Sequence, residues 1–168
     1  MMKQLFTIFA LLLFISGVQM AQKYSMNREE IPAEYKWNFA DIYGSWEEWE
    51  AGLKDLETKM DEIAAFKGTL SSGPENLLKV QKLNDELGVL SYRVYRYPAL
   101  QRDTDTRNQE ISAKLQQVQI LFAKFNIATS WINPEMLQIP WETMKGWLDG
   151  NSEFEPYRFG IEDLYRQQ

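Results

Sequence analysis

Carboxylate side chains are the first groups in this sequence that could do chemistry, because they occur in short clusters. These clusters are Glu29-Glu30, Glu47-Glu48 with Glu50, Asp61-Glu62, and Asp103 with Asp105. Paired carboxylates can act as the acid and base of a glycosidase, or bind a hard cation such as Ca²⁺. The Asp103-Thr104-Asp105 segment alternates as a calcium loop does, but it lacks the later Gly and Glu of an EF-hand. We therefore expect solvated helix surface, rather than a catalytic or metal site, at these acids.

Aromatic and arginine side chains form a second candidate group in one short segment. The group consists of Tyr92, Arg93, Tyr95, Arg96 and Tyr97. Rings and guanidinium groups can together line a site for a sugar or a peptide. Contact between helices explains the same residues without a ligand, and we prefer that interpretation.

Two residue types that carry much of enzyme chemistry are missing: the 168 residues include no His and no Cys. This excludes Ser-His-Asp and Cys-His nucleophiles, disulfides and Cys/His zinc sites within the chain. We assign no catalytic, cofactor-binding or metal-binding residue, and expect no cofactor in this chain. The net charge of −6 argues against a nucleic-acid partner, because such proteins use Lys and Arg to displace counterions from phosphates.

The elements that would have to position any site are predicted to be helices. In three segments apolar residues recur at alternating spacings of three and four, which indicates one buried stripe along each helix. The stripes are Trp46, Trp49, Leu53, Leu56, Met60 and Ile63; Val80, Leu83, Leu87, Leu90, Val94 and Tyr97; and Ile111, Leu115, Val118, Phe122, Phe125, Thr129 and Ile132. We predict helices over residues 45–66, 74–98 and 106–132, and two shorter ones that begin at Pro140 and Pro156.

Residues typical of helix ends separate these segments. We expect a capping box at Ser45 and Glu48, a stop at Gly68, a cap at Ser72, an end or kink at Pro98, and a closing turn at Asn133-Pro134. No segment alternates apolar and polar residues for long, so strands are not expected. The prediction is an all-α fold of long antiparallel helical hairpins, in preference to an intermolecular coiled coil.

The first 44 residues are predicted to precede the helical part. Residues 1–21 contain Lys3 and an apolar run from Leu5 to Val18, shorter than the ~20 residues that span a bilayer. This is typical of a signal peptide cleaved near Ala21, so we expect export to the periplasm or beyond and no stable membrane anchor; an uncleaved anchor is the alternative. Residues 22–44 are predicted to be an extended arm, with aromatic residues that pack on the same protein rather than on a partner.

Five strings, taken in order, carry a resemblance to a known family. They are REEIPAEYKWNFADIYGSWEEWE from Arg28, FKGTLSSGPENLLK from Phe66, YRYPALQRDTDTRNQE from Tyr95, FNIATSWINPEMLQIPWETM from Phe125 and YRFGIEDLYRQQ from Tyr157. Together they resemble the N-terminal region of oligoendopeptidase F, one of the thimet-like zinc metallopeptidases of peptidase family M3. The resemblance covers the chain from about Arg28 to its last residue.

The resemblance implies a mostly helical region that helps to enclose a deep channel for peptides. In the family, a C-terminal catalytic domain carries H-E-x-x-H and a further Glu, binds one Zn²⁺ and cleaves short peptides. Two His of that motif hold the metal, and its Glu is the general base. None of these residues can be transferred to a chain without His. The chain also departs from the family pattern at Phe159-Gly160, where a His is expected after Tyr157-Arg158, and in its leader.

Residues 45–168 are therefore interpreted as the non-catalytic, helical N-terminal domain of an exported oligoendopeptidase F-like peptidase. The catalytic domain is expected to be missing, oligopeptides to be bound by the full-length protein, and this chain to be inactive alone. The alternative is a free-standing exported helical module that binds peptides or proteins without catalysis. We also expect a truncated chain with exposed apolar surface, because the last helix reaches Arg166-Gln167-Gln168 without a Gly or Asn cap.

Overall fold

The computed structural model describes residues 30–167, which belong to two compact units divided between Trp37 and Asn38. The described part of the first unit, residues 30–37, contains one 3-10 turn, η2 (Ala33–Tyr35), with Tyr35 and Trp37 exposed. The predicted signal peptide, residues 1–21, and the beginning of the predicted arm lie outside the described residues. No helix within residues 30–167 combines the length and the apolar character needed to cross a membrane.

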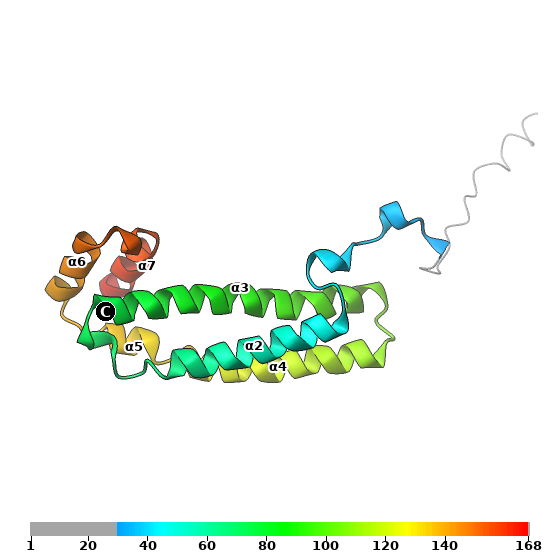
Figure 1. The fold of residues 1–168 in the computed structure, drawn as a ribbon, viewed down its shortest axis with the longest axis horizontal. Coiled ribbons are helices and arrows are strands. Elements are labelled where there is room, and N and C mark those ends of the chain that lie inside the picture. The colour runs from blue at the N-terminus through cyan, green and yellow to red at the C-terminus, as the bar shows by residue number, and fades with distance from the viewer. Residues whose placement is uncertain (1–29, 168) are drawn as a thin grey trace, which may run out of the picture. The chain divides into compact units, whose positions relative to one another are not determined.

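Three long helices form the main body of the second unit (Figure 1). They are α2 (Trp46–Ala64), α3 (Pro74–Thr104) and α4 (Gln109–Thr129), and each packs against the other two. The stripes predicted for α2 and α3 are mostly buried, and Trp49, Leu56 and Leu87 are fully so. The stripe predicted for the third helix is only partly correct: Leu115 and Val118 of α4 are buried, but Phe122 and Phe125 are half-buried, and Leu121, outside the stripe, is buried instead. Helices are the only regular elements among residues 30–167 apart from 3-10 turns, so the all-α prediction is confirmed.

The start of α2 has the predicted capping box with one difference. Ser45 Oγ accepts a hydrogen bond from the Glu48 backbone N–H at 3.3 Å, as expected. The Glu48 carboxylate, however, accepts from the N–H of Gly44 at 2.8 Å, one residue before the cap. The helix ends at Ala64, and Gly68 follows with a φ of +85°, a conformation that glycine adopts without strain. The predicted stop at Gly68 therefore marks the turn after the helix.

The second helix departs from the prediction at both ends. Ser72 does not cap it: this residue lies in a 3-10 turn, η4 (Leu70–Ser72), and Gly73 precedes α3 without a side-chain bond. Pro98 does not end it either, because α3 continues to Thr104. Pro98 is buried, and packing of this part of α3 on the other helices outweighs the one backbone bond that a proline removes.

The third predicted helix is divided in two. Its first part, α4, starts after Asn108, whose Oδ1 accepts from Ile111 N at 3.1 Å, and ends at Thr129. Asn133-Pro134 does not close it, since both residues lie inside a separate short helix, α5 (Ile132–Met136). The Glu135 carboxylate of α5 accepts from the backbone N–H groups of Gly68 and Leu70, at 2.7 and 2.8 Å. These bonds tie α5 to the turn after α2.

Two short helices complete the unit at one end of the bundle (Figure 1). As predicted, α6 (Trp141–Gly150) follows Pro140, and α7 (Glu155–Arg166) has Pro156 in its first turn; η5 (Ser152–Phe154) joins them. Phe154 is fully buried beneath them. The Tyr165 hydroxyl lies 2.6 Å from Met136 O and 2.7 Å from Ile139 O, which fixes α7 against the segment that follows α5.

The second unit also contains the end of the predicted arm. Residues Phe39–Asp41 form a 3-10 turn, η3, with Asn38 Oδ1 accepting from Ala40 N at 3.2 Å. Tyr43 is buried, and Phe39 and Ile42 pack against the same core. Residues 38–44 thus bury their large side chains on the helices of their own chain.

Candidate functional site

The acids of the described clusters are not gathered into a metal site, and several acids of the same segments are paired with cations. Asp105 makes an ion pair with Arg107 at 2.9 Å, and this bond holds the pKa of the Asp105 carboxyl below its usual range. Glu50 and Glu57 of α2 pair with lysines of α4, as shown by the Glu50–Lys114 and Glu57–Lys124 distances of 3.1 and 3.2 Å. Within residues 30–167 no three His, Cys, Asp or Glu side chains lie together as a metal site requires.

The aromatic and arginine group is divided by the structure, and part of it is core. The Tyr97 side chain is buried and makes an edge contact with the ring of Trp46, whose centroid is 4.9 Å away. The Arg93 guanidinium lies 4.9 Å from the Tyr43 ring centroid and donates to the carbonyl of Ile42. Tyr97 and Arg93 therefore hold the chain before α2 on the bundle, which is the packing role preferred from the sequence.

The rest of the group lies on the surface of α3. The Arg96 guanidinium is 4.8 Å from the Tyr92 ring centroid and 5.7 Å from that of Tyr95, and Tyr95 contacts Phe122 of α4. Tyr92 remains 59% exposed. These two rings and one cation form an exposed aromatic edge on α3.

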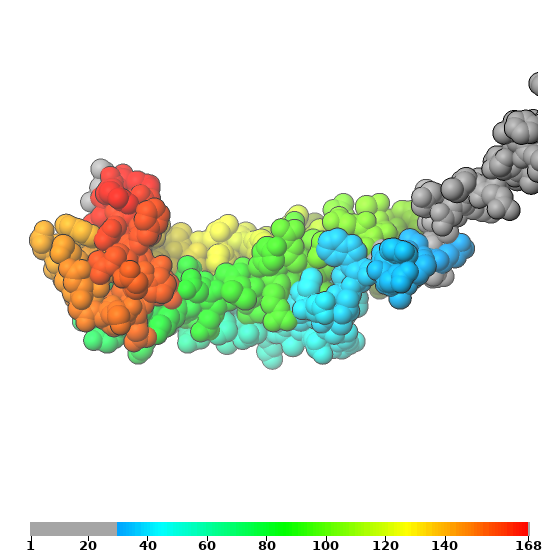
Figure 2. Space-filling view, turned by 90° about the horizontal axis from the view of Figure 1, so that it is seen from above, coloured from blue at the N-terminus to red at the C-terminus, as the bar shows by residue number. Residues whose placement is uncertain are grey.

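A groove that the sequence did not reveal is present in the helical unit, with a volume of about 710 Å³. It lies where α3, the end of α4, α5 and α7 meet, and Figure 2 shows the orange and red surface of α7 beside the green of α3 and the yellow of α4. Its polar lining includes Gln81, Asn84, Asn126, Thr129, Ser130 and Asn133, and its apolar lining includes Ile132, Met136, Ile161 and Leu164. No lining residue is charged, although 25% of the chain's residues are.

The carboxamides of the groove have few partners. Gln81 Nε2 donates to the Met136 sulfur at 3.3 Å, a weak acceptor. The side chains of Asn84, Asn126 and Asn133 make no hydrogen bond with any residue that the structure describes. Both donors and acceptors of these three side chains are therefore available to a ligand.

The hydroxyl groups of the groove are not arranged for catalysis. Ser130 Oγ and Thr129 Oγ1 donate to the carbonyls of Ile127 and Phe125 in their own helix, at 3.1 and 3.0 Å, and neither is bonded to a base. Tyr157 Oη donates to Asp85 Oδ2 at 2.8 Å. Burial and this bond raise the pKa of Tyr157 to about 12, so the phenol stays neutral. None of these three hydroxyl groups is therefore activated as a nucleophile.

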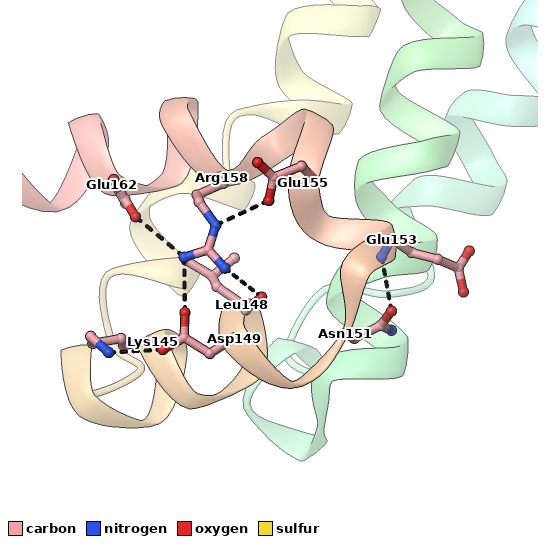
Figure 3. Close-up of polar contacts among 8 residues, drawn as sticks. All are labelled: Lys145, Leu148, Asp149, Asn151, Glu153, Glu155, Arg158 and Glu162. Atoms are coloured by element: carbon pink, nitrogen blue, oxygen red, sulfur yellow. Dashed lines mark hydrogen bonds and ion pairs between the residues drawn. The ribbon is translucent and has the colours of Figure 1, made fainter.

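A network around Arg158 supports this end of the unit (Figure 3). Its guanidinium pairs with Asp149 of α6 at 3.0 Å and with Glu155 of α7 at 3.4 Å, and donates to Leu148 O at 2.7 Å. Figure 3 shows these groups converging on Arg158 from both helices. The next residue, Phe159, stands where the family pattern led us to expect a His, and its side chain is 74% exposed. Arg158 therefore holds α6 against α7, while Phe159 faces outward.

Comparison with known sequences finds peptidases. The chain is 27% identical over 144 residues to group B oligopeptidase PepB of Streptococcus agalactiae, and 24% identical over 156 residues to oligopeptidase PepF of Bacillus subtilis. These alignments cover 84% and 90% of this chain but only 24% and 23% of the relatives. The chain thus spans about a quarter of the length of the curated relatives it matches. No protein-family model matches it.

Solved structures give the same result for the fold. An oligoendopeptidase F from Enterococcus faecium superposes with a TM-score of 0.63 and 26% identity, over 71% of this chain and 24% of that one. A proposed peptidase from Chlamydophila abortus superposes with a TM-score of 0.71 and 26% identity, over 83% of this chain and 24% of that one. The resemblance to oligoendopeptidase F that the sequence suggested is confirmed.

Proposed function

We propose that this chain is the helical, non-catalytic region of an oligoendopeptidase F-like peptidase, and that its groove forms one wall of the peptide site. The observation that carries the proposal is the similarity of almost the whole helical unit to about a quarter of each peptidase. On this proposal, the residues that cleave the peptide belong to the part of such a protein that this chain does not span.

The side chains that could bind a metal support the proposal that another part of the peptidase performs the cleavage. Hydrolysis by zinc needs ligands such as His or Cys, and the 168 residues contain neither. Within residues 30–167 no group of three carboxylates is arranged to hold a metal ion, and several carboxylates are already paired with lysine or arginine. These residues do not fit a zinc ion, so no step of catalysis is assigned to them.

The groove is suited to the role of a binding wall. Its sides come from α3, α4, α5 and α7, so its lining is held on packed helices rather than on free loops. Carboxamides and hydroxyls line it together with apolar side chains, and this mixture can contact both the main chain and the side chains of a peptide.

We further propose that the protein is exported. The proposal rests on the composition of residues 1–21, in which Lys3 precedes the apolar run from Leu5 to Val18. It is tested by expressing the complete coding sequence in its host and determining the N-terminus of the mature protein. Recovery of the protein in the cytoplasm with Met1 intact would contradict it.

A chimera tests the peptidase proposal. Residues 38–167 would replace the matching quarter of the Bacillus subtilis relative, and cleavage of a quenched fluorescent peptide would be measured with and without a chelator. We expect chelator-sensitive hydrolysis by the chimera, none by the relative without its matching quarter, and none by the 168-residue chain alone. A chimera that binds peptide but never cleaves it would favour a free-standing binding module. Chelator-sensitive turnover by this chain alone would refute the proposed division of labour.

A further inference from the structure

We infer that the groove between α3, α4, α5 and α7 binds an uncharged stretch of peptide and discriminates against charged side chains. The inference rests on the proposed function and adds a selectivity to it. It is drawn from three features of the groove, namely its unbonded carboxamides, its lack of charge and its apolar floor.

The carboxamides can bond to a peptide main chain. Each offers an N–H donor and a carbonyl acceptor, the two kinds of group that each peptide unit also presents. Asn84 comes from α3, Asn126 from α4 and Asn133 from α5, so the three approach the groove from different helices. Because none of them is bonded to another described residue, a peptide would form new bonds without breaking existing ones within the protein.

The absence of charge gives the selectivity. A Lys or Glu side chain that entered the groove would lose water and find no opposite charge among the lining residues. The nearby acid Asp85 already accepts the hydrogen bond from Tyr157. An uncharged side chain carries no such cost, and the buried side chains of Ile132, Met136 and Ile161 offer it an apolar floor.

One glycine allows the groove to be filled without disturbing the fold. Gly160 of α7 lines the groove, and a Cβ placed on it would meet nothing within 4 Å. A Gly160→Leu side chain would therefore extend from the wall of the groove. Gly146 of α6 is its matched control, because it is also a helical glycine with open space around it and does not line the groove.

The test is a titration of the complete, isotope-labelled chain, followed by NMR of the Asn and Gln side-chain amides. The probes are acetylated and amidated pentapeptides, Ala-Ala-Leu-Ala-Ala and its analogues with Glu or Lys at the centre. We expect the Leu peptide to bind about tenfold more tightly than either charged analogue. Gly160→Leu should weaken its binding by about tenfold, and Gly146→Leu should leave it unchanged.

A negative charge added to the groove gives a second test. Its expected effect on selectivity could not arise from blocking the groove alone. Asn133→Asp changes one carboxamide to a carboxylate of the same shape, and should improve binding of the Lys peptide by about tenfold relative to the Glu peptide. Gln117→Glu on the exposed surface of α4, away from the groove, is the control and should change neither.

The outcomes separate this inference from the proposed function. Equal affinities for the three peptides would overturn the selectivity, and insensitivity to Gly160→Leu would overturn the location. Undetectable binding of the Leu peptide would also overturn the inference. None of these results bears on whether the chimera hydrolyses peptides, which is measured separately. Loss of hydrolysis in the chimera with binding intact would instead count against the proposed function.

Discussion

The phenolic oxygen of Tyr43 lies directly over Gly52, so closely that a Cβ at residue 52 would be 2.4 Å away from it. Tyr43 precedes α2 and Gly52 lies within it, and both are buried. The Tyr43 ring also makes an edge contact with Tyr97 of α3, at a centroid distance of 5.5 Å. The glycine leaves the space that allows the segment before α2 to pack on the bundle.

Gly52→Ala is expected to destabilise the protein by about 1–3 kcal/mol, because Tyr43 would have to move out of a packed site. In an open helix the same change stabilises by roughly 0.5–1 kcal/mol. Gly146→Ala is the control for that effect, since nothing lies within 4 Å of its Cβ. Urea unfolding of both variants checks the prediction, and a Gly52→Ala protein as stable as Gly146→Ala would contradict it.

Tyr43→Phe is expected to be neutral or slightly stabilising, which is unusual for a change at a buried residue. The Tyr43 hydroxyl is buried and has no hydrogen-bond partner in the structure of residues 30–167. Its removal eliminates an unsatisfied polar group, and so offsets the loss of contacts. The same change should reduce, but not abolish, the penalty of Gly52→Ala: it removes the phenolic oxygen, which is the nearest atom at 2.4 Å, but keeps the ring carbons at 2.9 and 3.0 Å. Additive penalties in the double variant would disprove this coupling.

A tertiary bond compensates for Pro98 within α3. Proline has no N–H to donate to the carbonyl four residues earlier, and Trp49 Nε1 of α2 donates to that carbonyl, Val94 O, at 2.8 Å. Trp49→Phe should therefore cost about 1–3 kcal/mol, because it leaves a buried acceptor unpaired. Pro98→Ala supplies the missing backbone donor, so the penalty should shrink in that background. Denaturant unfolding of the four proteins in the cycle measures the coupling, and a zero value would rule out this role for Trp49.

Stability should fall between about pH 10 and 12, partly because of Tyr157. Its pKa is raised from 10.0 to about 12 in the folded protein, so the folded state holds a proton that the unfolded state releases. The contribution of Tyr157 is thus fully present below pH 10 and is lost as the pH rises through about 12. Burial raises the pKa values of Tyr43 and Tyr165 as well, and they add to the decline.

Tyr157→Phe isolates the contribution of this residue. The variant should show a shallower loss of unfolding free energy over that interval, measured by urea midpoints at a series of pH values. Tyr92→Phe, at an exposed position on α3, is the control and should keep the wild-type slope. An unchanged slope in Tyr157→Phe would show that burial and the bond to Asp85 do not raise the pKa of Tyr157.

Arg158→Ala is expected to loosen α6 against α7. The variant loses the bond to Leu148 O and the pairs with Asp149 and Glu155. Amide hydrogen exchange should become severalfold faster in the last turn of α6 while the three-helix bundle is unaffected. Lys145→Ala removes only an exposed pair with Asp149 and should have little effect. Uniform change across the protein would argue against a local role for Arg158.

The helices could be predicted because their signals are local. Spacings of three and four predicted that Trp49, Leu56 and Val118 would be buried. The Ser45 cap could be predicted from Ser45 and Glu48, three residues apart. The continuation of α3 through Pro98 could not be predicted in this way, since it depends on a donor 45 residues away in α2. A proline alone signals a helix end, and only the packed structure reveals the substitute bond.

The groove escaped prediction for a related reason. Asn84, Asn126 and Asn133 are unremarkable polar residues in sequence, and they meet only because four helices do. The uncharged run from Asn126 to Asn133 was the one available signal, and it is weak. The aromatic and arginine group was more conspicuous, but two of its members serve the core. Tyr97 already belonged to the stripe of α3, so its burial could be foreseen, whereas the bond from Arg93 to Ile42 could not.

The hydrogen bonds that the Glu135 carboxylate accepts limit the order in which parts of the helical unit can fold. The acceptor for the N–H groups of Gly68 and Leu70 lies 67 and 65 residues further along the chain. A nascent α2–α3 hairpin would therefore leave the ribosome with these two amides unpaired, and they would acquire their partner only when α4 has folded back and α5 has docked. Closure of so long a loop costs chain entropy, which is recovered only when the later helices make their contacts. The connection between α2 and α3 should thus be among the last parts of the helical unit to become protected.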